Sequence, residues 1–307
     1  MRARELNSKL FEALESGLDS LRISRRQFVQ LMAAGVVASM LPGCETVDAI
    51  LDQIAHRRVR KDITTLAPTD PDIVTFKQAV SLMKGLSATD NRNWTNQANI
   101  HLNHCPHGNW LFLPWHREYL YRFEEICREL TGSKKFALPY WNWSKNPQIP
   151  ALFFDSSSPL YDPGRVATIA DTVPSTAVGP AVISGILAQP NFLLFASGSI
   201  SASANQRTIS AYDPLEGNPH NTVHGFVGGD MGTYLSPLDA IFWTHHNMVE
   251  RLWVDWNMKL GNPNTNDPAW TNRQFTDFFD QHGNPVTISV FQMLLYPLFV
   301  YRYDDLP

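Results

Sequence analysis

The sequence has few cysteines, no long apolar run and no excess of basic residues. Three cysteines among 307 residues are too few for a disulfide scaffold. No apolar run reaches the roughly 18 residues that a membrane-spanning helix needs. With 25 Lys and Arg against 29 Asp and Glu, the chain has no basic stripe, so nucleic acid is not expected as a partner.

The apolar content is sufficient for a sizeable core in one large domain or two small ones. Apolar residues make up 44% of the chain, including 9 Trp and 17 Phe. Residues 139–215 are rich in Pro, Ser and Gly but contain no repeat and no charge block. We interpret them as a long ordered excursion over the core, with short helices near 149–154 and 181–195.

The N-terminal segment predicts export. Arg25 and Arg26 precede a short, weakly apolar run at 31–40, which is typical of a Tat signal over residues 1–43. A basic turn before a short core helix is the alternative. Export through Tat would make the mature protein periplasmic or secreted. Cys44 closes a stretch similar to a lipoprotein box and is a possible lipid anchor, although a simple peptidase site also fits. Residues 44–57 would be a tether and 58–307 the functional domain.

Helical periodicity and breaker residues predict most of the fold. We expect helices over residues 70–86, from Pro114 to about residue 130, and over 236–260, where Ser236 and Asp239 form a capping-box pattern. Residues 88–99 are polar and predict a loop. Alternating aromatics at 301–303 predict a strand or extended segment that packs back on the core. The expected fold is therefore mainly α, with long irregular loops and little β.

Two histidines four residues apart suggest a metal site. His220 and His224 lie on one face of a helix. Asn218 fits the N-cap of that helix, Pro219 its first position and Gly225 its end. An isolated pair of this kind is more often a surface or core feature than a ligand pair, so the other histidines decide the interpretation.

A second group of histidines surrounds the helix that begins at Pro114. His116 shares the apolar face of this helix, whereas the charged residues are expected to face away from the core: Arg117, Glu118, Arg122, Glu125, Arg128 and Glu129. His101, His104 and His107 precede it closely. His245 and His246 lie together on the last long helix, where apolar periodicity does not choose between them.

These histidines form two candidate sets of three, and no carboxylate is interleaved with them at ligand spacing. Three imidazoles per metal suit zinc or copper, and copper is favoured by affinity. One set would suggest a zinc site, whereas two sets on neighbouring helices suggest a paired metal centre in a helix bundle. The absence of a bridging carboxylate favours oxygen chemistry over hydrolysis. The sets are His101 or His104 with His107 and His116, and His220 and His224 with His245 or His246.

The motifs resemble the tyrosinase family of type 3 binuclear copper proteins, which includes tyrosinases, catechol oxidases, o-aminophenol oxidases and molluscan hemocyanins. The resemblance rests on WLFLPWHREYL at 110–120, PHNTVH at 219–224 followed by Gly228 and Gly229, and the stretch from Asp239 to Trp253. It covers about residues 58–305. It implies a four-helix core that holds two copper ions, and oxidation of o-diphenols to o-quinones with O2 as co-substrate, together with monophenol ortho-hydroxylation.

The resemblance also implies a role for individual residues. The first copper would be held by His101, His107 and His116, although His104 competes with His101, and the second by His220, His224 and His246. His245 would lie next to a ligand or in the core. Cys105 would form a thioether with His107, or else remain a free buried thiol. Glu216 and Asn221 would hold a water that helps to deprotonate a phenol. Alternatively, Glu216 caps the helix start.

Further expectations complete the sequence interpretation. Arg60 should make a structural cation–π contact with Tyr301 or Tyr303. Ala240 and Glu250 stand where many relatives have Pro and Asp. Because four residues follow Tyr303, no C-terminal shielding domain is expected. The partners would be a small phenolic substrate and a copper-delivery protein. An o-aminophenol oxidase, a hemocyanin-like oxygen carrier and a non-enzymatic copper-binding protein are the alternatives.

Overall fold

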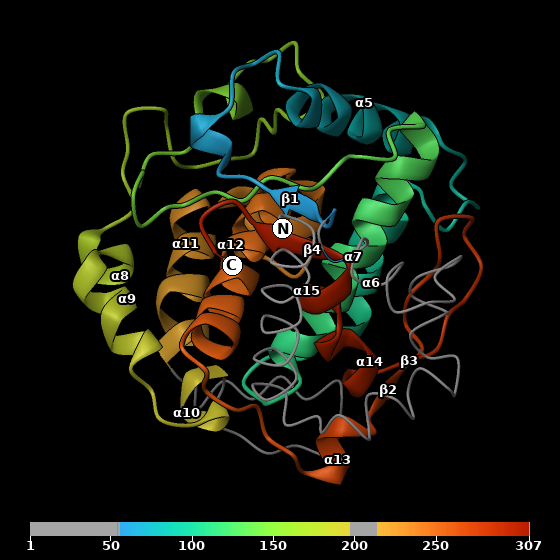
Figure 1. Ribbon diagram of the computed structural model, residues 1–307. Helices are drawn as coiled ribbons and strands as arrows, with labels where there is room; N and C mark the ends of the chain where they lie inside the picture. Colours follow the sequence, from blue (N-terminus) through green and yellow to red (C-terminus); the bar gives the residue numbers. More distant parts are fainter. Residues whose placement is uncertain (1–53, 55, 197–213, 307) are drawn as a thin grey trace, which may run out of the picture.

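In the part of the chain that the structure describes, the protein is mainly helical and has two small two-stranded sheets (Figure 1). This computed structural model describes residue 54, residues 56–196 and residues 214–306. The expected export signal at 1–43, Cys44 and most of the tether lie outside the described residues, so they remain predictions. In the described part, none of the helices combines the length and apolar character required to cross a membrane.

Most of the helical residues belong to five helices, which Figure 1 shows as two groups. The first group is α5 (Pro71–Gly85), α6 (Trp94–His104) and α7 (Phe112–Thr131), and the second is α11 (Asn221–Val227) and α12 (Ile241–Val254). Helix α7 packs against both α5 and α12. The predicted mainly α fold with a four-helix core is confirmed. The shorter helices are α8 (Ser175–Val178), α9 (Pro180–Leu187), α10 (Phe192–Ala196), α13 (Pro268–Thr271), α14 (Val290–Leu294) and α15 (Tyr296–Phe299).

Helix α6 corrects the expectation of a loop over residues 88–99. It begins at Trp94, where the Asn93 side chain accepts a hydrogen bond from the backbone N–H of Thr95. The helix is polar on most of its surface but buries Trp94 and His101. A narrow apolar stripe within a polar sequence is easily mistaken for a loop, because the hydrophobic period is then carried by very few residues.

Helix α7 differs from the expectation that its charged residues face away from the core. Arg117 and Glu118 are both buried. Arg117 donates to Glu250 at 2.9 Å, and Glu118 accepts from the Tyr296 hydroxyl at 2.7 Å. These partners lie more than 130 residues away in sequence. The charges are tolerated inside because each is paired and hydrogen-bonded.

The last long helix begins later than the sequence indicated. Residues Ser236–Leu238 form a separate 3-10 turn, and α12 begins at Ile241. The Asp239 carboxylate accepts from the Ile241 N–H but also pairs with Arg165 at 2.5 Å. The expected capping box at Ser236 was therefore wrong, because Asp239 is committed to Arg165. At the other end, a π-helical turn (Asp255–Lys259) extends the helix to Gly261, which adopts a positive φ of 71° as expected for a stop.

The described part of the predicted excursion, residues 139–196, is anchored on the core. It contains a 3-10 turn (Ala151–Phe153) and the short helices α8, α9 and α10, which confirms the predicted helices. Arg165 fastens it to the start of α12, and the backbone N–H groups of Val166 and Ala167 donate to the Val227 carbonyl. The excursion thus packs against both helices of the second group.

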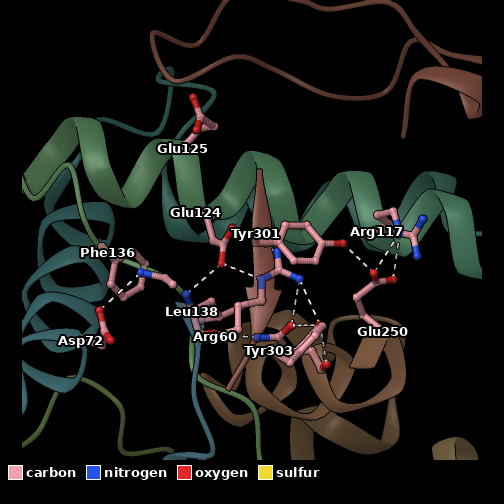
Figure 2. Close-up of polar contacts among 12 residues, drawn as sticks. Arg60, Asp72, Arg117, Glu124, Glu125, Phe136, Leu138, Glu250, Tyr301 and Tyr303 are labelled. Carbon is pink, nitrogen blue, oxygen red and sulfur yellow. Dashed lines mark hydrogen bonds and ion pairs between the residues drawn. The ribbon is translucent and has the colours of Figure 1, made fainter. Parts of the chain in front are cut away.

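The two ends of the described domain meet in a parallel pair of strands. Strand β1 (Arg58–Arg60) pairs in register with β4 (Tyr301–Tyr303), which confirms the predicted C-terminal strand. A second pair joins β2 (Gln274–Phe275) to β3 (Ile288–Ser289). Figure 2 shows Arg60 between Glu124 and the two tyrosines. Its guanidinium donates to Glu124 at 2.9 Å and lies 3.6 Å from the centre of the Tyr301 ring, so the expected cation–π contact is confirmed.

Candidate metal centre

Six of the predicted ligands come together from four parts of the fold. His101 lies on α6, His107 in the turn after it and His116 on α7. His220 ends the π-helical turn before α11, which carries His224, and His246 lies on α12. Five of the six are buried, and His224 is partly exposed. The structure also distinguishes His101 from His104: the His104 side chain is 41% exposed and lies 3.4 Å from Asp277, away from the other imidazoles.

The second trio has the spacing of ligands on one metal ion. The Nε2 atom of His246 lies 3.3 Å from that of His220 and 3.1 Å from that of His224. Two metal–imidazole bonds of about 2.0 Å at a tetrahedral angle place the two nitrogens about 3.3 Å apart. The second trio therefore needs no rearrangement of its helices to bind a metal.

Hydrogen bonds at Nδ1 determine which nitrogen of each ring can bind a metal. Backbone carbonyls accept from Nδ1–H of three rings at 2.7–2.8 Å: Tyr234 from His101, Phe112 from His116, and Met231 from His224. A carbonyl only accepts, so Nδ1 carries the proton and the lone pair of the neutral ring lies on Nε2. The sequence does not reveal these three partners, because any residue type supplies a backbone carbonyl.

The first trio is wider but adjoins the second. The ring centres of His101, His107 and His116 lie 5.4–5.7 Å apart in all three pairs. His116 stacks on His246 with 4.4 Å between ring centres and 8° between planes. Nitrogen atoms of His101, His116 and His246 lie within 4.8 Å of one another. The two trios are thus neighbours rather than separate sites.

Electrostatics favour neutral rings in most of the cluster. Burial, followed by repulsion from neighbouring imidazoles, lowers the pKa of four rings well below the usual histidine value: His116, His220, His224 and His246. Burial alone would also lower the pKa of His107, but Cys105 and Glu216 raise it to about 9. A metal at His107 would therefore have to displace a proton on binding.

Glu216 and Asn221 each contact a predicted ligand. The Glu216 side chain is fully buried, and Oε1 accepts from His107 Nδ1 at 2.9 Å and from the Gly108 N–H at 2.8 Å. The side-chain oxygen Oδ1 of Asn221 accepts from His220 Nδ1 at 2.9 Å. Both side chains therefore orient imidazoles. The helix-capping alternative for Glu216 does not predict a contact with His107.

The helix predicted to carry His220 and His224 differs at both ends from the sequence prediction. Asn218 and Pro219 lie inside a π-helical turn, and Asn218 has extended backbone angles that interrupt the helix. The helix continues past Gly225 to Val227 and ends at Gly228, where φ is 68°. Gly225 stays inside the helix, and Gly228 ends it because its positive φ lies in the region that favours glycine.

Cys105 is buried beside the first trio. Its sulfur and nitrogen atoms of His101 and His107 lie within 4.8 Å of one another. Burial alone would raise the pKa of the thiol, but the two imidazoles lower it to about 5. The thiol is therefore a neighbour of both rings, and the thioether to His107 stays a prediction.

An open pocket of about 300 Å³ gives access to the cluster. Four of the six histidines line it, together with Asn221, Gly225 and Tyr234, and the side chain of Tyr234 lies 5.6 Å from the His107 ring, centre to centre. The donor set fits copper, because it is made of imidazoles with Nε2 facing inward and includes no carboxylate among the grouped donors of the described residues. A small aromatic molecule could approach the donors from this side.

Comparison with known proteins places the same region in a known family. A profile described as the common central domain of tyrosinase matches residues 80–199 and 187–259. Polyphenol oxidase A1 of Vicia faba, a chloroplastic protein, is 32% identical over 275 residues, which cover 76% of this chain and 45% of the relative. The chloroplastic (+)-larreatricin hydroxylase of Larrea tridentata is 31% identical, with 70% of this chain and 44% of the relative covered.

A solved structure of similar fold is latent apple tyrosinase. It matches with a TM-score of 0.73 and 27% identity, over 82% of this chain and 63% of that chain. Among the curated relatives, this chain spans 45% of the length of the Vicia faba protein and 44% of the length of the Larrea tridentata protein, less than half of each.

Proposed function

Because the chain belongs to the tyrosinase family, we propose that it is a copper-dependent oxidase that converts o-diphenols to o-quinones with O2 as co-substrate. The proteins similar to it include a polyphenol oxidase and a tyrosinase. His101, His107 and His116 would hold the first copper, and His220, His224 and His246 the second. Two copper ions would supply the exchange of electrons between phenol and O2.

The observation that carries the proposal is the adjacency of two all-imidazole trios at an open pocket. The stacked rings of His116 and His246 belong to different trios yet lie 4.4 Å apart. Two metals held by such trios would belong to one centre, which would supply the electron exchange between a phenol and O2. The absence of a carboxylate from the grouped donors in the described part of the chain separates this centre from paired-metal hydrolases.

We further propose that the enzyme ortho-hydroxylates monophenols. A phenol has a pKa near 10 and must lose its proton to react at neutral pH. Glu216 is a buried carboxylate bonded to His107, and Asn221 lines the pocket beside His220. The two could hold the water proposed to accept the proton. A relative named as a hydroxylase, at 31% identity, supports the same chemistry.

The test is to incubate copper-loaded protein with tyrosine, catechol and o-aminophenol under air and to follow coloured product and O2 consumption. Quinone from catechol supports the oxidase, and product from tyrosine supports the hydroxylase. Turnover of o-aminophenol alone would replace the proposal by an o-aminophenol oxidase. Reversible O2 binding without product would replace it by an oxygen carrier. The chain without copper is the control.

The cellular setting of this activity is also a proposal. Arg25 and Arg26 support export by Tat, with copper acquired before translocation, through a delivery protein or from free ions. The two named relatives are chloroplastic, so their targeting does not identify the compartment of this chain. Cys44 would add a lipid anchor if it is processed as a lipoprotein.

A further inference from the structure

Two of the residues that line the pocket at the histidine cluster are glycines. Gly225 lies on α11 directly after His224. Gly232 directly follows Met231, whose carbonyl accepts from His224 Nδ1 at 2.7 Å. Both glycines therefore lie beside a proposed copper ligand. Because both are exposed, they form part of the rim of the pocket rather than its floor.

The local backbone does not require glycine at either of these positions. Gly228 and Gly229 do require it, since their φ values are 68° and 60°. Gly225 and Gly232 are not among the glycines with positive φ in the described part of the chain. Glycine inside a helix such as α11 is less favourable than alanine. The glycine at position 225 therefore has a cost that its own conformation does not explain.

Each of the two glycines leaves open space where a side chain would be. Among the described residues, no atom beyond the chain neighbours and the helix backbone lies within 4 Å of a Cβ added at Gly225 or Gly232. This space adjoins a pocket of about 300 Å³, which is within the range of volumes that hold drug-sized ligands. A single phenol ring is much smaller than such a ligand, so the pocket has room for a substituent on the ring.

The side chains around this space indicate an uncharged substituent. Apart from the histidines, every described residue that lines the pocket has an uncharged side chain, including Met231, Thr233 and Tyr234. A charged substituent would lose its water there without gaining a counter-charge, which is unfavourable. An apolar substituent would gain free energy in proportion to the apolar area removed from water.

We propose that the pocket selects phenols with a bulky uncharged substituent, which lies in the space beside Gly225 and Gly232. This inference rests on the proposed function and specifies its substrate class. The phenolic oxygen would face the imidazoles, and the substituent would extend past His224 toward the rim. The competing hypothesis is that the pocket binds only the phenol ring and that the two glycines are surface residues without a role in recognition.

Three variants separate these two hypotheses. Gly225→Leu and Gly232→Leu fill the space at the rim. Gly185→Leu is the matched control, because Gly185 is an exposed glycine on α9 with nothing within 4 Å of an added Cβ and does not line the pocket. Thermal unfolding of each protein checks that it folds.

Binding is measured on the full-length chain loaded with zinc, which imidazoles bind and which has no redox chemistry. Isothermal titration calorimetry gives the dissociation constants of phenol and 4-tert-butylphenol. We expect the wild type and Gly185→Leu to bind 4-tert-butylphenol about tenfold more tightly than phenol, because the substituent buries apolar surface. Gly225→Leu and Gly232→Leu should lose most of this preference. The anion 3-(4-hydroxyphenyl)propanoate should bind more weakly than 4-tert-butylphenol, and tighter binding would refute the restriction to uncharged groups.

Turnover gives a second measurement, on the copper-loaded chain with catechol and 4-tert-butylcatechol. Gly225→Leu should raise KM for 4-tert-butylcatechol about tenfold more than KM for catechol, since the lost contact discriminates by size. The effect should be in KM rather than kcat, because the substituent lies away from the reacting oxygen. Equal changes for the two catechols would show that the rim does not recognise the substituent.

The outcomes also separate this inference from the proposed function. Equal binding of phenol and 4-tert-butylphenol by the wild type would overturn the inference, and this comparison needs no variant to fold. If catechol is oxidised nonetheless, the oxidase stands and only the substrate class is refuted. If the zinc-loaded chain prefers 4-tert-butylphenol but the copper-loaded chain oxidises no phenol, the proposed function is refuted and the selectivity of the pocket stands.

Discussion

The Glu216 carboxylate accepts a hydrogen bond from His107 Nδ1 at 2.9 Å, although the two residues are 109 positions apart. Glu216 opens the π-helical turn that leads to His220. A ligand of the first proposed copper is therefore held by the segment that supplies ligands of the second. The position of α11 and the orientation of the His107 ring depend on each other.

Replacing Glu216 by Gln tests this link. The amide keeps the shape but removes the charge next to His107, so we expect the first copper to bind about tenfold more weakly. We also expect monophenol turnover to fall more than diphenol turnover, because general-base assistance is worth about 10²-fold or more. Both rates are measured at matched copper content, and equal losses would refute a role in phenol deprotonation.

A thioether at Cys105 predicts a change of mass. When copper-loaded protein turns over under air, formation of an S–C bond between Cys105 and His107 removes one hydrogen from each partner, with O2 as the oxidant. Intact-mass analysis should show the loss of two hydrogens, and peptide mapping should locate the cross-link. Cys105→Ser should abolish the loss, whereas Cys127→Ser should retain it, because Cys127 lies in α7 and outside the grouped donors.

The tight approach at Gly229 predicts a loss of stability. Gly229 has a φ of 60°, and a Cβ there would lie 2.2 Å from the Gly164 carbonyl oxygen. A strained backbone position alone costs about 1–3 kcal/mol. We expect Gly229→Ala to lower the free energy of unfolding by more than this, because the added Cβ also clashes with the Gly164 backbone. Urea unfolding measures it. Gly185→Ala is the control, because nothing lies within 4 Å of its added Cβ, and it should stabilise α9 by about 0.5–1 kcal/mol.

The buried pair of Arg60 and Glu124 predicts sensitivity to acid. Burial alone would raise the pKa of Glu124, but Arg60 and Arg128 hold it below its usual value. A depressed carboxyl pKa contributes stability that is complete above the unfolded-state value of about 4.3. That stability is lost as the pH falls through the folded-state pKa.

Glu124→Gln should therefore cost about 3–5 kcal/mol at neutral pH, because it leaves Arg60 buried without its counter-charge. The variant should also show a shallower decline of stability with pH below about 4.3, since one titrating group is gone. Urea unfolding at several pH values checks both. An unchanged acid slope would show that Glu124 does not contribute to it.

The sequence was most informative where chemistry constrained residue identity. His220 and His224 could be identified as candidate ligands because they lie four residues apart on one helix face, and His116 because other histidines lie close to it in sequence. The family resemblance predicted the contact of Arg60 with Tyr301 or Tyr303. The main helices followed from apolar periodicity and from start residues such as Pro114.

The remaining features depend on distant partners. Helix α6 was missed because its apolar stripe is narrow, and Arg117 was placed outside the core because its partner, Glu250, is 133 residues away. The Met231 carbonyl that fixes His224 carries no side-chain signature at all. Spacing along the chain contains local information, whereas these contacts are set by how helices pack.

The parallel pairing of β1 with β4 has a consequence for biosynthesis. Arg60 and Tyr303 are 243 positions apart, and contacts of such long range form late because closing the intervening loop is costly in entropy. During translation, the buried Arg60 cannot acquire its aromatic cover until the last strand has left the ribosome. All the histidines will have emerged by then, so the order of events places the closing of the core after the complete ligand set has been synthesised.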